Sequence, residues 1–176
     1  MNQNKSYHIP VLVDEVINYL SPKDGSTYLD VTFGGGGHTR AILNANKKCE
    51  VIALDWDMAS IEGPAQVLAE EHPERFTILW GSFAHVIKIF KKENIKKVDG
   101  ILADFGTSFY QIQNRSGFSF SRDTPLDMRM SPSHHRVTAA DVLNYSEEKV
   151  LNDIFFNLGE EKNARLFARE IVKRRQ

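Results

Sequence analysis

Hydrophobic and polar positions alternate in blocks along the first part of the chain, and the blocks differ in length. Short apolar runs bounded by polar or turn residues cover Thr27–Val31, Glu50–Leu54, Phe76–Trp80 and Val98–Ala103. Runs of this length, rich in β-branched and aromatic residues, are typical of buried strands. Because helix-length segments separate them, the pattern predicts an α/β fold with a parallel sheet whose faces are covered by helices.

Helical spacing of apolar residues recurs around these strands and after the last of them. Gly63 and Pro64 predict a late start or a kink in one helix, because proline removes a backbone donor. Thr138 is a suitable cap for a later helix. The expected helices are Pro10–Leu20, His38–Ala45, Met58–Glu71, Ala84–Lys92, Ala139–Leu143, Ser146–Gly159 and a last one that begins near Glu160.

Four consecutive glycines, Gly34 to Gly37, follow the first predicted strand and precede a helical pattern. Glycines lack Cβ atoms, so the backbone can approach a ligand closely, and the next helix presents free N–H groups. The segment is therefore a candidate cofactor turn. A dinucleotide fingerprint would place its third glycine where this chain has Thr39, which disfavours a nicotinamide cofactor.

Acidic residues stand at the carboxyl ends of two predicted strands. Asp55 ends the second strand, where a carboxylate accepts hydrogen bonds from ribose hydroxyls in doubly wound sheets. S-adenosylmethionine carries that ribose without a phosphate, so the glycine turn and Asp55 fit it at least as well as a dinucleotide. Asp104 ends the fourth strand and is either a hydrogen-bonded structural group or a site residue; its place on the same rim favours the site.

Composition limits the class of protein to which the chain can belong. The chain has 176 residues, 41% hydrophobic and 26% charged, which is typical of a soluble globular protein of about one domain. We expect no membrane span and an intracellular location. The single cysteine, Cys49, has no partner for a disulfide or a zinc site. The scattered His8, His72 and His85 lack ligand spacing, so we expect no metal.

The second part of the chain is modestly basic, although the net charge is −1. From Phe105 to Gln176 there are 11 lysines and arginines against 9 acidic residues, and Lys162, Arg165, Arg169 and Lys173 share a helical stripe. A solvated surface and a surface that contacts phosphates both explain this charge. Residues 111–137 lack periodicity, and long segments of this kind are usually functional or disordered. Their apolar residues, such as Phe118 and Phe120, predict that the segment packs onto something.

Several motifs together carry a resemblance to a known family. They are His8–Leu12, Asp30–His38, Ala53–Asp57, Gly117–Phe120, Pro125–Met130, Gly159–Glu161 and Ile171–Val172. With these motifs the chain resembles the bacterial small-subunit (16S) ribosomal RNA cytosine-N4 methyltransferases, the RsmH or MraW family, from His8 to the end. The string Pro-Leu-Asp-Met-Arg-Met at Pro125–Met130 is the most specific of them.

The resemblance implies a class I, Rossmann-like methyltransferase that uses S-adenosylmethionine, with a helical insert after the fourth strand. Residues 1–110 would form the cofactor-binding core and residues 111–176 the first part of a substrate-recognition insert. The remaining strands of the sheet would lie beyond Gln176. The expected activity is methyl transfer to the N4 amine of a cytosine in small-subunit ribosomal RNA.

The resemblance also implies site residues. Asp104 would be catalytic, near the transferring methyl group, and Phe109 and Tyr110 would hold the target base. Arg122 and Arg129 are candidate contacts to the RNA. Contacts to S-adenosylmethionine are expected from Gly36, Gly37, His38, Asp55, Phe83, Asp104 and Gln111.

Departures from the family pattern keep a second interpretation open. Phe105–Phe109 stands where the family usually has Leu-Gly-Val-Ser-Ser, and Ser116 replaces an arginine. A catalytically impaired remnant that binds cofactor or RNA is therefore the alternative to an enzyme. A half-sheet would leave an uncovered strand edge, so a homodimer is also possible. The expected compartment is the bacterial cytoplasm, with the mitochondrial matrix as the alternative.

Overall fold

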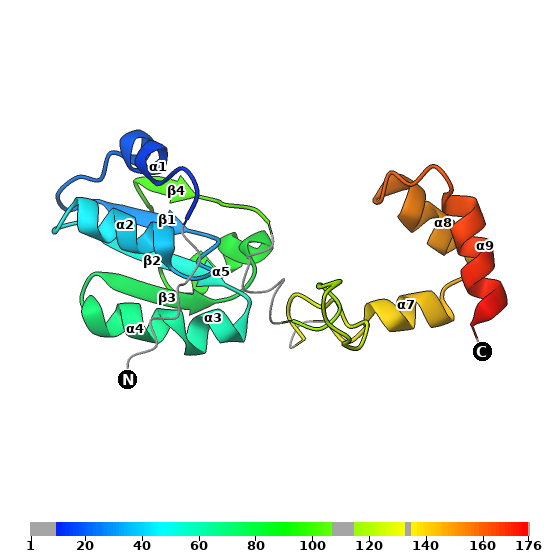
Figure 1. The fold of residues 1–176 in the computed structure, drawn as a ribbon. Coiled ribbons are helices and arrows are strands. Elements are labelled where there is room, and N and C mark those ends of the chain that lie inside the picture. Colours follow the sequence, from blue (N-terminus) through cyan, green and yellow to red (C-terminus); the bar gives the residue numbers. More distant parts are fainter. Residues whose placement is uncertain (1–9, 107–114, 133–134, 176) are drawn as a thin grey trace. The chain divides into compact units, whose positions relative to one another are not determined.

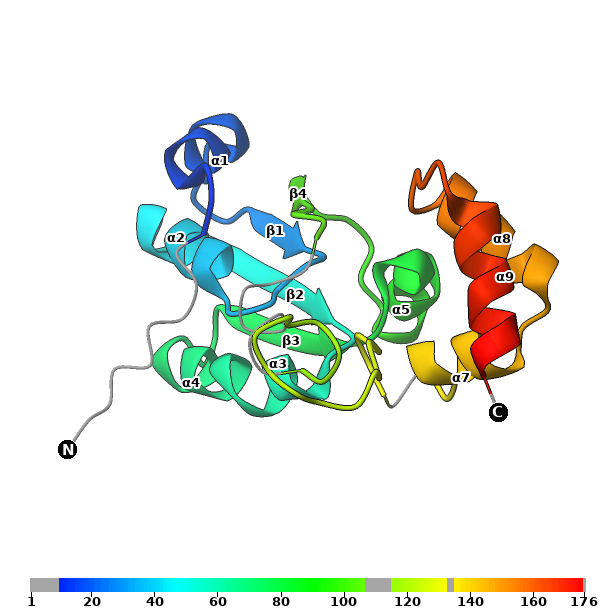
Figure 2. The same ribbon diagram turned by 45° about the vertical axis from the view of Figure 1, so that its right-hand side comes forward.

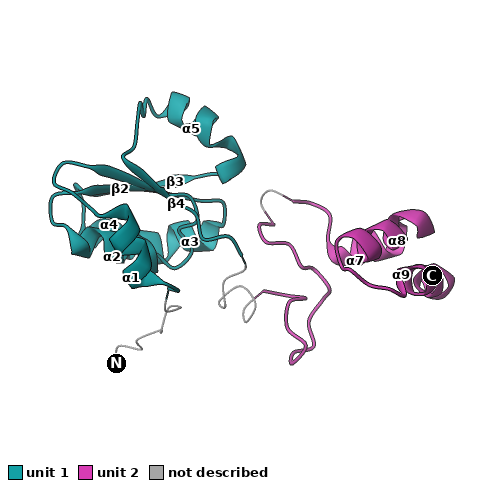
Figure 3. Ribbon diagram, turned by 90° about the horizontal axis from the view of Figure 1, so that it is seen from above, with its two compact units in different colours: residues 1–110 teal, residues 111–176 magenta. Residues whose placement is uncertain are grey.

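The computed structural model describes residues 10–106, 115–132 and 135–175. The chain forms two compact units, residues 1–110 and residues 111–176 (Figures 1 and 3). Among the residues that are described, no helix has the length and apolar character needed to cross a bilayer.

A four-stranded parallel sheet forms the centre of the first unit and confirms the predicted fold class. Its strands are β1 (Thr27–Asp30), β2 (Glu50–Asp55), β3 (Phe76–Trp80) and β4 (Gly100–Leu102). The order across the sheet is β3-β2-β1-β4, and all neighbouring pairs are parallel. β4 is shorter than the predicted Val98–Ala103, because side chains replace backbone partners at both ends: the Thr27 amide donates to the Asp99 carboxylate, and the Asp104 amide donates to the Thr32 hydroxyl.

Helices pack on both faces of this sheet (Figures 2 and 3). α1, α2 and α4 cover one face and α5 covers the other. The helices of the first unit are α1 (Val13–Leu20), α2 (Gly37–Ala45), α3 (Met58–Glu62), α4 (Pro64–Glu71), the 3-10 turn η1 (Phe83–His85) and α5 (Val86–Lys92).

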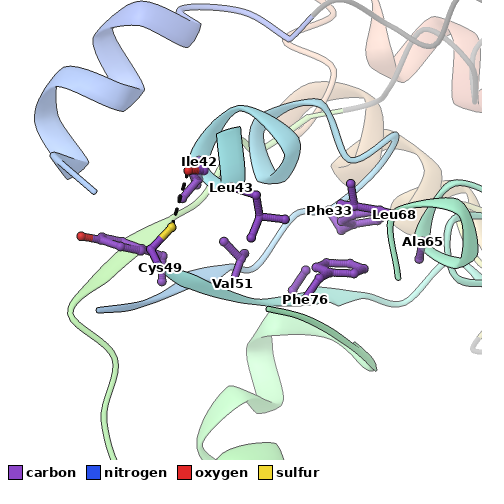
Figure 4. Packing of buried hydrophobic residues seen from close by; sticks show 10 residues of the cluster. Phe33, Ile42, Leu43, Cys49, Val51, Ala65, Leu68 and Phe76 are labelled. Atoms are coloured by element: carbon purple, nitrogen blue, oxygen red, sulfur yellow. Dashed lines mark hydrogen bonds between the residues drawn. The ribbon is translucent and has the colours of Figure 1, made fainter. Parts of the chain in front are cut away.

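The side chains of β2 show how the strands fill both layers. Val51 and Ala53 point to the cluster shared with α1, α2 and α4, whereas Leu54 is buried in the cluster next to α5. In the first cluster the rings of Phe33 and Phe76 stack with their centroids 5.5 Å apart (Figure 4). This alternation explains why the strands read as continuous apolar runs.

Backbone conformation moves the start of the first helix and confirms the predicted interruption at Gly63 and Pro64. α1 begins at Val13 and not at Pro10, because Leu12 has a left-handed φ of 53° and forms the N-cap. The predicted interruption at Gly63 and Pro64 separates two helices, α3 and α4, where one kinked helix was an alternative.

The described part of the second unit contains three helices: α7 (Ala139–Tyr145), α8 (Glu148–Asn157) and α9 (Ala164–Arg174). Thr138 caps α7 as predicted, and Asp141 completes a reciprocal capping box with it. α9 begins four residues later than expected, because Glu160 adopts a left-handed φ of 51° that a helix excludes. Residues 115–132 contain no helix or strand; within them Phe118 is partly buried, whereas the Phe120 side chain is fully exposed.

A fork between Asp127 and Arg129 organises the loop before α7. The Asp127 carboxylate accepts from Arg129 Nε at 2.7 Å and from Nη2 at 2.8 Å. Arg129 Nη1 also donates to the His135 carbonyl, and the Asp127 carbonyl accepts from the Ala139 amide at 2.9 Å. The Arg129 guanidinium therefore joins the loop to the start of α7.

The same fork predicts an acidic carboxyl. Hydrogen bonds from Arg129 lower the pKa of Asp127 from 3.8 to about 2. The pair thus stabilises the loop above the ordinary pKa, and this stabilisation is lost as the pH falls through about 2. In Arg129→Met we expect the Asp127 pKa to return toward 3.8, measured by carbon NMR titration of the carboxyl groups.

Asp141 serves as the internal control for this titration. Its pKa is lowered first by Thr138 and only weakly by Arg129. It should therefore change little in Arg129→Met. An Asp127 carboxyl that titrates at its ordinary pKa in the unaltered chain would contradict the fork.

Candidate functional site

The strand order places one rim of the sheet at a topological switch point. β2 lies on one side of β1, and the chain later returns to place β4 on the other side. In open parallel sheets, ligands bind outside the carboxyl ends of the strands at such a point. Here the glycine turn follows β1 and Asp104 follows β4, so both border this position.

The glycine turn is held by backbone bonds to both neighbours of β1. The Val31 amide donates to the Leu102 carbonyl, and the Phe33 amide donates to the Leu54 carbonyl, each at 3.0 Å. Gly34 and Gly36 have φ values of 54° and 77°, which side chains with a Cβ adopt only with strain. A Cβ on Gly36 would also lie 2.7 Å from Cζ of the buried Phe33 ring.

Two glycine substitutions separate the cost of the left-handed φ from the cost of overlap with the Phe33 ring. Gly25 has a similar φ of 72°, but a Cβ there meets nothing within 4 Å. We expect Gly25→Ala to lower the free energy of unfolding by about 1–2 kcal/mol, the cost of a left-handed residue. Gly36→Ala should cost about 1–3 kcal/mol more, because the methyl group overlaps the Phe33 ring. Urea denaturation measures both variants, and equal losses would contradict the predicted overlap.

Asp55 joins the end of β2 to the glycine turn. Its Oδ2 accepts from the Gly34 amide at 2.7 Å, and its Oδ1 accepts from the Asp57 amide at 2.8 Å. Burial raises the pKa of Asp55, while the bonds from Asp57 and Gly34 act in the opposite direction. Each carboxylate oxygen keeps a lone pair beyond these bonds. The Asp55 carboxylate can therefore accept hydrogen bonds from ligand hydroxyls, such as those of the expected ribose.

His38 is buried in this site although it opens helix α2. Only 8% of its side chain is exposed, and Nε2 donates to the Val11 carbonyl at 2.8 Å. Since a carbonyl only accepts, Nε2 carries the proton, and Nδ1 lies 3.9 Å from Asp104 Oδ2. This burial excludes a surface position for His38, and its expected contact to S-adenosylmethionine stays a prediction. The bond to Val11 thus fixes the imidazole beside the rim, near Asp104.

Asp30 is the principal site-forming residue for which sequence reasoning assigned no role. It is 1% exposed, and its Oδ2 accepts from the Thr39 hydroxyl at 2.7 Å. Its Oδ1 accepts from the Thr32 amide at 3.0 Å, and Thr32 Oγ1 in turn accepts from the Asp104 amide at 2.7 Å. An acidic residue that ends an apolar strand directly before a glycine turn was the available signal.

Burial raises the pKa of Asp30, so its ionisation opposes folding. In the unaltered chain this contribution weakens the fold as the pH rises above the ordinary value of 3.8, because the unfolded state loses its proton first. We expect Asp30→Asn to remove that contribution, since its amide oxygen still accepts from Thr32 and the Thr39 hydroxyl can turn to accept from the amide nitrogen.

The measurement is the difference in free energy of unfolding between Asp30→Asn and the unaltered chain. As the pH rises from about 4 to about 7, the free energy of unfolding of Asp30→Asn should increase relative to that of the unaltered chain. Asp30→Ala is the comparison, because it removes the charge and also leaves the Thr32 and Thr39 donors without their acceptor. A difference that does not change with pH would contradict the role of burial.

Two aromatic side chains approach each other beside the rim. Phe83 follows β3 and Phe105 follows Asp104, and their ring centroids are 5.1 Å apart with the planes at 57°. Their exposed fractions are 46% and 69%, which are large for phenylalanine. Phe83 was a predicted cofactor contact, whereas Phe105 was noted only as a departure from the family pattern.

The other predicted site residues are Phe109, Tyr110, Gln111, Arg122 and Arg129. Phe109, Tyr110 and Gln111 lie outside the described residues and stay predictions. Arg122 is exposed in the second unit and donates to the Arg115 carbonyl at 3.4 Å. Arg129 has three of its donors engaged in the fork described above, so a role in RNA binding would rely on its two other N–H groups.

Comparison with known proteins gives consistent matches. A family model described as the MraW methylase family matches residues 5–176. The ribosomal RNA small subunit methyltransferase H of Rhodospirillum centenum is 46% identical over 172 residues, which cover 97% of this chain and 51% of that protein. The protein of the same name from Carboxydothermus hydrogenoformans is 44% identical, over 96% of this chain and 54% of its own.

This chain thus spans about half the length of the curated relatives it matches. Among solved structures, a dimethyladenosine transferase from Plasmodium falciparum aligns with 62% of this chain and 38% of its own. The TM-score is 0.46 and the sequence identity 20%, so this likeness carries no weight for function.

Proposed function

Because this chain belongs to the MraW methylase family, we propose that it transfers a methyl group from S-adenosylmethionine to ribosomal RNA of the small subunit. The acceptor in this proposal is the N4 amine of a cytosine, as the family resemblance implies. The main support is the rim at the switch point, where the glycine turn, Asp55 and Asp104 come together. The similar proteins are bacterial, so the proposed setting is the bacterial cytoplasm and not the mitochondrial matrix.

Each rim residue has a chemical role in this proposal. The turn at Gly36 and Gly37, with His38, would border the methionine end of the donor, and Asp55 would accept from the ribose hydroxyls. Phe83 would contact the adenine with its exposed face. The rim residues fit S-adenosylmethionine. They offer carboxylate acceptors and apolar surface, and the ligand carries hydroxyls, a cationic sulfur and a purine.

S-adenosylmethionine supplies an electrophilic methyl group. The cytosine amine is a weak nucleophile, because its lone pair is delocalised into the ring, so positioning must provide much of the catalysis. Asp104 is well placed to position the amine, because its own amide is fixed by Thr32 and its side chain is 45% exposed at the rim. A carboxylate there would accept a hydrogen bond from the amine and aim its lone pair at the methyl group.

The second unit would contact the RNA backbone, whereas the last residues of the first unit would hold the target base. A target base must leave its stack before it enters a pocket, and the predicted contacts Phe109 and Tyr110 would hold it there. The exposed cations Lys162, Arg165, Arg169 and Lys173 would contact backbone phosphates. The division into residues 1–110 and 111–176 would then correspond to cofactor and substrate units.

Two measurements on the purified chain test the function. Calorimetry with S-adenosylhomocysteine tests donor binding, and incubation with radiolabelled S-adenosylmethionine and unmodified small ribosomal subunits tests transfer. We expect binding, and label in N4-methylcytosine after digestion of the RNA. Binding without transfer would contradict the proposed enzyme and support a cofactor-binding protein, whereas no binding by the folded chain would contradict both.

The role of Asp104 gives a sharper prediction. We expect Asp104→Asn to lower the rate of transfer by about 100-fold or more, because a neutral amide accepts weakly from the cytosine amine. Affinity for S-adenosylhomocysteine should change little. Asp123→Asn, at an exposed carboxylate of the second unit, is the matched control and should keep the full rate. A normal rate in an Asp104→Asn protein that binds cofactor would exclude the role.

A further inference from the structure

Phe105 presents an exposed aromatic ring beside the candidate cofactor site. Its exposed fraction of 69% is unfavourable for an isolated phenylalanine, because the ring is large and apolar. The ring nevertheless contacts Phe83, at a centroid distance of 5.1 Å and an interplanar angle of 57°. Tilted pairs of this kind are favourable, but this one leaves much of both rings uncovered.

The backbone fixes the place of Phe105 with respect to the rim. The preceding residue, Asp104, is tied through its amide to Thr32, and Thr32 is tied to the buried Asp30. Phe83 comes from the carboxyl end of β3, directly after Gly81 and Ser82. Two rings from different strand ends therefore form one apolar surface next to the carboxylates of the site. An apolar surface with few polar groups around it is the usual composition of a ligand site.

We propose that Phe105 is a second contact for the purine of the methyl donor, and that with Phe83 it forms an aromatic corner for that ring. This inference rests on the proposed function and extends it to a residue that the family pattern does not supply, because the family usually has leucine at this position. Stacking on a phenylalanine ring adds affinity that a leucine provides less well. Phe105 would thus hold the base of the donor, separately from Asp55, which would hold its ribose.

The proposal is specific to the base, and this separates it from a structural role. Phe105 should affect ligands that contain adenine and leave ligands without it unchanged. S-adenosylhomocysteine carries the base, and S-ribosylhomocysteine lacks it but keeps the sugar and amino acid. A residue that merely shapes the rim would alter the binding of both.

The experiment measures dissociation constants of these two probes by calorimetry for three variants of the full chain. Phe105→Leu should weaken S-adenosylhomocysteine binding by about fivefold to tenfold and leave S-ribosylhomocysteine unchanged. Phe105→Tyr should restore the affinity, because it keeps the ring. Phe156→Leu replaces an exposed phenylalanine of α8 in the second unit and is the matched control.

The outcomes separate this inference from the function on which it rests. If the unaltered chain binds S-adenosylhomocysteine and Phe105→Leu binds it equally well, the aromatic corner is overturned and the proposed function stands. Equal weakening of both probes also overturns it, since the effect would then be structural. If the folded, unaltered chain binds no S-adenosylhomocysteine, the proposed function fails and this inference fails with it.

Discussion

The buried carboxyl of Asp30 is the constraint on which the site depends. It receives hydrogen bonds from Thr39 in α2 and from Thr32 after β1, and Thr32 holds the amide of Asp104 after β4. One side chain thus sets the spacing of the glycine turn, the following helix and the fourth strand end. A group of this kind is costly to bury, so it is retained only where its partners are complete, as they are here.

Much of the fold was predictable because, in the first unit, the sequence pattern of each segment agrees with the structure that the segment forms. The strands from Thr27 and Glu50 are mostly buried, and the strand from Phe76 is partly buried, so their apolar pattern agrees with their environment. Gly63 and Pro64 gave the break between two helices for a simple covalent reason. The rim position of Asp55 and Asp104 followed from strand direction alone, because parallel strands end at the same edge.

The unpredicted features depend on contacts between distant segments or on single backbone angles. The burial of His38 comes from the Val11 carbonyl, which belongs to a segment before the first helix. The late start of α9 follows from the left-handed Glu160, a conformation that glutamate rarely adopts and that its sequence context does not signal. The pairing of Phe83 with Phe105 depends on the paths of the segments after β3 and β4, which bring the two rings together although these strands lie at opposite edges of the sheet.

The pairing of β1 with β4 also has a consequence for folding. The contacts that close this edge, from Thr27 to Asp99 and from Thr32 to Asp104, each join residues 72 positions apart. Contacts of such long range form late, because the entropy of loop closure is lost before they can compensate for it. During synthesis β1 therefore keeps an open edge until the chain has emerged beyond residue 104, and an open edge readily pairs with another chain. The segment that completes the rim is thus also the one that ends the interval in which the nascent protein is most prone to aggregate.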